Sequence, residues 1–188
     1  MKILIIGLGN IGEEYNDTRH NIGFNIVNEF AAQFETKFEE AKYGKLAEIK
    51  YAGKHLYILK PNTYMNLCGK AYQYYLQLLN ISPLESLIIV DDLALPLGKL
   101  RLKGNGGSAG HNGLKSISDL LGHQNYPRLR FGIGNNFSPG RQVEFVLGKW
   151  KKEEQTEVTI STKEAVDAIL FYVKNGLNNS MTKYNQTL

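Results

Sequence analysis

Continuous apolar runs alternate along this chain with stretches in which apolar residues recur every three or four positions. The runs over 3–6 and 87–90 predict strands that are covered on both faces of a sheet. Helical spacing of apolar residues predicts helices over 26–34, 66–79, 111–121 and 152–175. Alternation of apolar and polar residues predicts a hairpin of 46–51 and 55–59, and strands over 97–103 and 128–133.

This order of strands and helices indicates an α/β fold, in which a mixed, mostly parallel twisted sheet is flanked by helices. With 188 residues, the chain suits a single domain over 1–188 that buries its core without disulfides or metal. The single cysteine, Cys68, excludes an internal disulfide framework. We expect the tail after Gly176 to be the least ordered part.

No apolar run approaches membrane-spanning length, and the opening run over 2–6 is too short for a signal peptide. We therefore expect a soluble cytosolic protein. The 22 lysines and arginines exceed the 18 aspartates and glutamates, for a net charge of +4 and a pI of about 9.0. This balance permits a polyanionic partner such as a nucleic acid but does not require one.

Two glycine-rich motifs suggest alternative functions. The segment 7–12 has the glycine pattern of dinucleotide-binding sites, but no helix is predicted within it and no acid ends the next strand. The segment 106–110 matches the nucleophile elbow of serine hydrolases, with Ser108 as nucleophile, but no suitable Asp-then-His pair follows. The four histidines form no helical pair, so we predict no metal site.

A histidine and a carboxylate are the strongest candidates for chemistry. His20 lies in a polar loop after the first strand, and Asp91 ends the apolar run over 87–90, where α/β sheets bind ligands. A carboxylate there can bond one imidazole nitrogen and leave the other free to take a proton from water. If the strand pleat continues, Asp92 faces the opposite way, and we interpret it as a turn or cap residue.

Three asparagines lie beside glycine-bearing loops or at helix starts: Asn10, Asn66 and Asn112. Each of them, considered alone, suits a turn or an N-cap. A side-chain amide can also donate to a carbonyl and accept from an N–H group, which suits recognition of a peptide backbone or positioning of a water molecule. Three such residues together favour a substrate-binding role.

Seven ordered segments extend these motifs through nearly the whole chain: 7–10 with 14–15, 18–23, 60–66, 91–93, 106–114, 128–134 and 145–149. In sequence and order they resemble the bacterial peptidyl-tRNA hydrolase family, and 167–185 is similar to its last helix and tail. The resemblance implies hydrolysis of the ester that joins a peptide to the terminal ribose of tRNA, which recycles tRNA from aborted translation. It also implies a monomeric α/β enzyme without metal or cofactor, whose partner is peptidyl-tRNA.

The same resemblance assigns roles to individual residues. The family's catalytic histidine falls on His20 and its orienting carboxylate on Asp91. In the mechanism that we hypothesise, Asn10 and backbone N–H groups support the oxyanion. The substrate-positioning asparagines are Asn10, Asn66 and Asn112, and the same groove is lined by Tyr15, Met65 and His111. The basic clamp on the end phosphate of tRNA falls on Lys103 and Arg130. The chain departs from the usual pattern at Ile11, Cys68, Ala94, Leu97 and Ala109, and none of these positions carries a proposed catalytic group.

Overall fold

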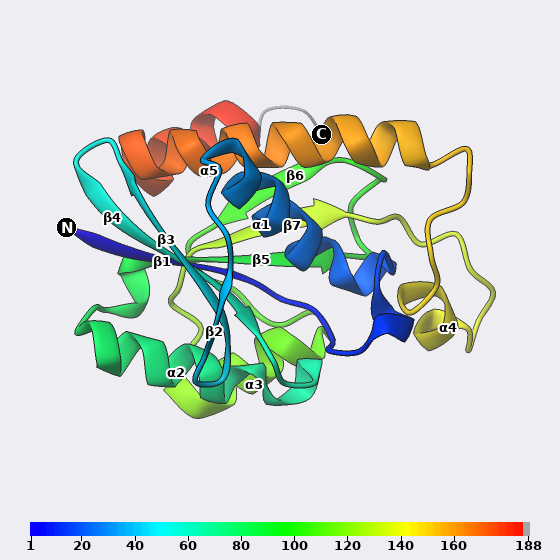
Figure 1. Cartoon of the computed structure of the whole chain (residues 1–188). Helices are drawn as coiled ribbons and strands as arrows, with labels where there is room; N and C mark the ends of the chain where they lie inside the picture. The colour runs from blue at the N-terminus through cyan, green and yellow to red at the C-terminus, as the bar shows by residue number, and fades with distance from the viewer. Residues whose placement is uncertain (186–188) are drawn as a thin grey trace.

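One mixed sheet organises residues 1–185, which are the residues described by this computed structural model (Figure 1). Its seven strands follow the spatial order β2 (Glu39–Ala41), β3 (Gly44–Tyr51), β4 (Lys54–Pro61), β1 (Lys2–Gly7), β5 (Ser86–Asp92), β7 (Arg128–Gly132) and β6 (Leu100–Lys103). The central strands β4, β1, β5 and β7 pair in parallel, whereas β2, β3 and β6 join through antiparallel pairs. The carboxyl ends of the four parallel strands therefore lie at one edge of the sheet.

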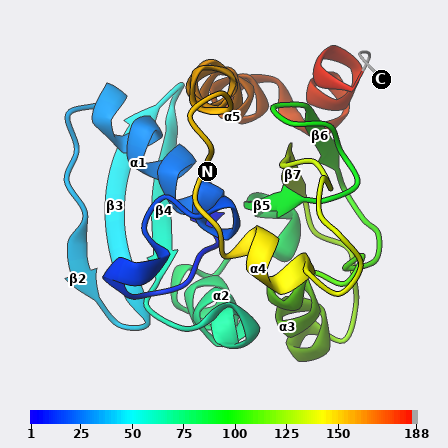
Figure 2. The ribbon, with the colours of Figure 1, turned by 90° about the vertical axis from the view of Figure 1, so that its right-hand side faces the viewer.

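Helices cover both faces of the sheet, as Figure 2 shows from the side at which the parallel strands end. On one face lie α1 (Ile22–Gln33) and α5 (Gln155–Tyr184), and on the other lie α2 (Cys68–Leu79) and α3 (Asn112–Leu121). The short α4 (Gln142–Val146) lies in front of the strand ends in that view. The connections contain the 3-10 helices η1 (Glu13–Tyr15), η2 (Arg19–Asn21), η3 (Met65–Leu67) and η4 (Pro83–Glu85).

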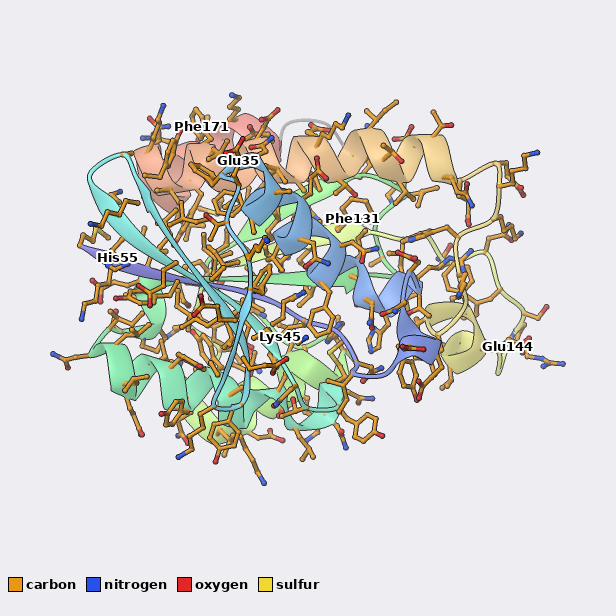
Figure 3. The ribbon with its side chains drawn as sticks, in the orientation of Figure 1. Glu35, Lys45, His55, Phe131, Glu144 and Phe171 are labelled. Carbon is orange, nitrogen blue, oxygen red and sulfur yellow. The ribbon has the colours of Figure 1, made fainter. Side chains whose placement is uncertain are left out.

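The alternation of side chains along β1 divides the core into two layers. Ile3 and Ile5 belong to the buried cluster under α1 and α5, while Leu4 and Ile6 belong to the cluster under α2 and α3. Successive residues of a strand face opposite sides, so a strand covered on both sides has to be apolar at every position. Phe131, labelled in Figure 3, lies in the first of these layers.

The predicted α/β class and the mixed sheet between helices are confirmed, and each predicted strand and helix has a counterpart. Several ends differ: α1 begins at Ile22 rather than at 26, and the strand predicted over 97–103 begins at Leu100. The prediction missed β2 and α4, because elements of three and five residues are too short to display a period. A single domain over 1–188 reaches beyond the described residues and stays a prediction.

The tail after Gly176, which was expected to be the least ordered part, is helical over 177–184. The last helix passes a break at Gly176, where φ is 78°, and continues to Tyr184. The side chain of Asn185 then bonds both the backbone N–H and the carbonyl of Leu102 at 2.9 Å. These bonds occupy backbone groups of the edge strand β6 and hold the end of the helix. Residues 186–188 lie outside the described part of the chain.

None of the helices in the described residues has both the length and the apolar character needed to cross a membrane.

Two glycines bring the start of α1 into backbone contact with the sheet. A Cβ atom at Gly23 would lie 2.6 Å from the nitrogen of Leu8 and 2.7 Å from the carbonyl oxygen of Ile89. A Cβ atom at Gly7 would likewise meet the carbonyl group of Gly23. The first turn of α1 can therefore approach the ends of β1 and β5 closely, which brings the residues before it near Asp91.

We expect Gly23→Ala to lower the free energy of unfolding by about 1–3 kcal/mol, because the added methyl group would overlap backbone atoms that cannot move aside easily. This cost outweighs the gain of about 0.5–1 kcal/mol that alanine brings to a helix. Chemical denaturation measures the difference. Gly107→Ala is the control, since no heavy atom lies within 4 Å of its Cβ position. Equal stability of both variants would contradict the close-contact explanation.

Candidate active site

A pocket of about 360 Å³ opens where the loops after β1 and β5 meet the start of α3. Helix α4 forms one wall through Gln142, Val143 and Val146. The polar side chains of the lining come from segments far apart in the chain: Asn10, His20, Asn66, Asp91, Asp92, Ser108, His111, Asn112 and Arg130. The carboxyl ends of parallel strands are the usual place for a ligand in an α/β sheet.

His20 and Asp91 are in direct contact in this pocket. The Nδ1 atom of His20 lies 2.9 and 3.0 Å from the two carboxylate oxygens of Asp91. The exposed fractions of the two side chains are 11% and 3%, so water screens the contact weakly. A carboxylate only accepts hydrogen bonds, so Nδ1 carries the proton. The Nε2 atom of His20 is therefore the nitrogen that remains to act as a base.

A second histidine contacts the same carboxylate. The Nε2 atom of His111 lies 2.9 Å from Oδ1 of Asp91, while its Nδ1 accepts the backbone N–H groups of Gly113 and Leu114 at 3.1 and 3.3 Å. His111 is thus the N-cap of α3. Because Nδ1 is an acceptor, the ring proton is assigned to Nε2 and points at Asp91. The sequence indicated that His111 lines a groove but gave no sign of this bond, apart from its position directly before a helix.

The two imidazole groups determine the ionisation of Asp91. Burial alone would raise its pKa, but the charges and hydrogen bonds of His111 and His20 act in the opposite direction and prevail. The pKa of Asp91 is therefore well below the usual value for an aspartate. The carboxylate stays ionised at neutral pH and can accept a bond from both rings.

The same three side chains are the group that could hold a metal ion, since one ligand atom from each lies within 4.8 Å of the others. For Nε2 of His111 to bind a metal ion, the ring proton would have to move from Nε2 to Nδ1. That shift would break two backbone bonds at the start of α3. The hydrogen bonds thus suit a shared carboxylate better than a metal centre, and the absence of a metal stays a prediction.

Asn10 is held in one orientation by two partners. Its backbone N–H and carbonyl groups bond the side chain of Asn21 at 2.8 and 2.9 Å, and its Oδ1 accepts the N–H group of Met65 at 2.8 Å. Because this oxygen is occupied, the NH₂ group of Asn10 is the end that remains to donate into the pocket. Sequence reasoning did not single out Asn21, although it directly follows His20.

Comparison with known proteins finds relatives that match along nearly the whole chain. The family model of peptidyl-tRNA hydrolase matches residues 4–188. The chain belongs to the peptidyl-tRNA hydrolase family. It is 51% identical over 185 residues to a peptidyl-tRNA hydrolase of Porphyromonas gingivalis, covering 98% of this chain and 100% of that protein. A relative in Cytophaga hutchinsonii is 46% identical over 185 residues, with 98% of each chain covered.

Solved structures extend the likeness to three dimensions. The crystal structure of peptidyl-tRNA hydrolase from Acinetobacter baumannii superimposes with a TM-score of 0.92 at 34% identity, covering 98% of this chain and 94% of that chain. The chain is therefore an enzyme of this hydrolase family, with the family's fold.

The structure brings most of the site residues expected from the family to the pocket. Met65 is buried at its lining, and Asn66 and Asn112 are exposed there. Tyr15 is in η1 and does not line the pocket. Lys103 lines a separate hollow beside Asn105 and Leu177. For these two residues, the proposed contact with a peptidyl-tRNA substrate would have to occur outside the pocket.

The structure corrects the expectation for Asp92. We predicted that it faces away from the site, but Asp92 lines the pocket together with Asp91. The pocket surrounds the end of β5, so the strand alternation no longer separates the two side chains. The predicted turn role is confirmed, because Oδ1 of Asp92 accepts the N–H group of Ala94 at 2.9 Å. Its other oxygen forms an ion pair with Nε of Arg130 at 2.9 Å, without the alignment of a hydrogen bond.

The alternative motifs lack the geometry they require. The segment 7–12 leads into two 3-10 helices, and α1 begins only at Ile22, so no helix N-terminus follows the glycines directly. Ser108 lines the pocket, but within the described residues no hydrogen bond joins its side chain to His20 or His111. Ala109 in the same loop has a left-handed φ of 50°, a conformation that residues other than glycine adopt rarely.

We expect His111→Asn to raise the pKa of Asp91. Asparagine can still cap α3 but is too short to reach the carboxylate. Burial, which raises the pKa of Asp91, is then opposed by the imidazole of His20 alone instead of by two imidazoles. NMR of the carboxyl carbon during an acid titration reports the change. Since the folded-state pKa is depressed, Asp91 stabilises the native state above about pH 4, and this contribution declines as the pH falls.

His123→Ala is the matched control, because His123 is exposed and has no bond to Asp91. An unchanged titration of Asp91 in His111→Asn would contradict the shared-carboxylate description.

Proposed function

We propose that His20 acts as the general base of a peptidyl-tRNA hydrolase reaction, in which the ester between a peptide and the terminal ribose of tRNA is cleaved. Membership of the family supports the reaction. The observation that carries the mechanism is the contact of His20 Nδ1 with Asp91, which leaves Nε2 free at a pocket large enough for a substrate carbonyl and a water molecule.

The reaction follows from the direction of these bonds. Asp91 orients the ring of His20, whose Nε2 takes a proton from water while the water oxygen attacks the ester carbonyl. The NH₂ group of Asn10 donates to the oxyanion that develops on the carbonyl oxygen. When the tetrahedral intermediate collapses, the proton on Nε2 passes to the departing ribose oxygen. The products are the free peptide acid and tRNA with an intact terminal ribose.

His111 has a supporting role in this proposal. Its Nε2–H group bonds one oxygen of Asp91, and its Nδ1 is anchored to the start of α3. The carboxylate is thereby held between two rings and is less free to rotate away from His20. Nearby, the groove residues Met65, Asn66 and Asn112 would position the peptide, with Tyr15 contributing outside the pocket.

Basic side chains on two neighbouring strands would position the tRNA. Lys103 on β6 pairs with Arg128 on β7, and Arg130 stands opposite Arg101, so Lys103 and Arg130 are diagonal neighbours on one face. Asp92 neutralises part of the charge of Arg130, whereas no carboxylate among residues 1–185 lies within 4 Å of the ammonium group of Lys103. We therefore assign the larger part of phosphate attraction to Lys103.

We further propose a monomer that acts in the cytoplasm, where translation supplies its substrate, as a single catalytic domain over 1–188 without metal or cofactor. The substrate partner would be peptidyl-tRNA, and hydrolysis would recycle tRNA from aborted translation.

His20→Ala should lower kcat for an N-blocked aminoacyl-tRNA by about a hundred- to ten-thousand-fold, because this range is typical for loss of a general base. Circular dichroism should show an unchanged fold. The control is His123→Ala, which removes an exposed histidine outside the pocket. Ser108→Ala separates this mechanism from a serine esterase: it should retain most of the activity. Near wild-type turnover of His20→Ala, or loss of activity in Ser108→Ala equal to that of His20→Ala, would refute the role of His20.

Lys103→Gln should raise KM for the tRNA ester and reduce the slope of log KM against log salt by about one, because one phosphate contact is lost. Cleavage of a small ester without tRNA should remain unchanged. Lys50→Gln is the matched control, since Lys50 is an exposed strand lysine that pairs with His55 at the start of β4, away from the carboxyl ends of the parallel strands. An unchanged salt slope in Lys103→Gln would remove Lys103 from the phosphate contact.

A further inference from the structure

The chain buries an arginine, Arg19, directly before the proposed base. Its side chain is 4% exposed and is surrounded by the segment 145–154. One guanidinium nitrogen donates to the carbonyl oxygens of Phe145 and Lys149 at 3.3 and 2.9 Å, and the other lies 2.7 Å from Glu154 Oε2. The guanidinium group also lies over the ring of Phe145 at 4.3 Å. The proposed chemistry does not use this residue.

The backbone adds to the same attachment. The N–H group of Arg19 bonds the carbonyl oxygen of Gly148 at 3.0 Å, and Thr18 forms an isolated antiparallel bridge with Lys149. The guanidinium group leaves little room for a side chain at position 148, because a Cβ atom on Gly148 would lie 3.1 Å from Nη1 of Arg19. The backbone and the side chain of Arg19 therefore hold the end of α4 and the chain that follows it.

Three consecutive residues are thus anchored to three different parts of the fold. Arg19 is bonded to the segment 145–154, His20 to Asp91, and Asn21 to Asn10. The first of these anchors matters for the pocket, because the segment begins with the last two residues of α4, and α4 forms one wall. A shift of Arg19 would move both the ring of His20 and that wall.

We propose that Arg19 is a positioning residue that couples the seating of α4 to the orientation of His20. This inference rests on the proposed role of His20 as the base. An arginine suits the position because its planar fork of donors reaches two carbonyl groups and a carboxylate at once. Lysine has a single ammonium group on a flexible stem and cannot span these acceptors in the same geometry.

Arg19→Lys should lower kcat by about ten- to a hundredfold, because displacement of a catalytic group by about 1 Å can cost a factor of a hundred. KM should rise as well, since the wall formed by α4 is no longer held. Glu154→Gln keeps an acceptor for Arg19 and removes only the charge. The decrease of kcat in Glu154→Gln should therefore be severalfold smaller than the decrease in Arg19→Lys. If Arg19→Lys does not fold, Glu154→Gln still tests the proposal, through a decrease of kcat beyond that of its control.

The chain provides a matched control pair at the start of α4. Arg141 and Glu144 form an ion pair at 2.6 Å, with 69% and 71% of their side chains exposed, and Glu144 points away from the molecule in Figure 3. Exposed pairs contribute about 0–1 kcal/mol. Arg141→Lys and Glu144→Gln should therefore retain wild-type kcat and KM.

Two measurements distinguish positioning from a general loss of stability. The Nδ1–H proton of His20, held by Asp91, should give a protected NMR signal that Arg19→Lys weakens and Arg141→Lys preserves. In the double variant Arg19→Lys/His20→Ala, kcat should fall little below that of His20→Ala alone, because Arg19 acts through a ring that is absent. Additive losses, or an intact His20 signal with unchanged kcat in Arg19→Lys, would overturn the proposal.

The two proposals fail in different ways. If the wild-type protein does not cleave N-blocked aminoacyl-tRNA, or if His20→Ala cleaves it normally, the role of His20 as the base is wrong. The NMR signal of His20 still decides whether Arg19 positions the ring. If His20→Ala is inactive while Arg19→Lys has wild-type kcat, KM and NMR signal, only the positioning role of Arg19 is wrong.

Discussion

The Asp91 carboxylate, shared between two imidazole rings, is the interaction on which the site depends. Asp91 is 5% exposed, and a buried charge is costly unless it is paired and hydrogen-bonded. His20 and His111 together supply those bonds, at 2.9 to 3.0 Å. The carboxylate selects the tautomer of His20, while the N-cap bonds of His111 place its ring proton on Nε2, facing the carboxylate. The chemistry expected of one histidine is therefore a property of three side chains.

The fold keeps the three side chains in contact because each of them is attached to a structural element or to neighbouring residues. His111 is fixed because it caps α3, and Asp91 is fixed at the end of a fully buried central strand. His20 lies in the short 3-10 helix η2, which is held by Asn21 on one side and by Arg19 on the other. A loop can carry a reactive group only if rigid elements restrain it. The contact of α1 with the sheet at Gly23 serves the same end.

Much of the fold could be predicted from the sequence because its elements carry strong periodic signals. The apolar runs over 3–6 and 87–90 became β1 and β5, and the helical patterns became α1, α2, α3 and α5. Elements without a period, β2 and α4, were missed. The end of the last helix is attached to β6 by bonds between Asn185 and Leu102, a contact across 83 positions that no local pattern reveals.

The sequence alone determined the residue types of the site and the family to which the chain belongs. Motifs such as 18–23 and 106–114 are each continuous in the chain, so they can be recognised without knowledge of the fold. Tertiary structure alone decided that His111 shares Asp91 and that Arg130 pairs with Asp92, whereas Tyr15 and Lys103 lie outside the pocket. His20 and Asp91 are 71 positions apart. A sequence specifies which groups can bond, but distance and direction arise only when the sheet brings the ends of its strands together.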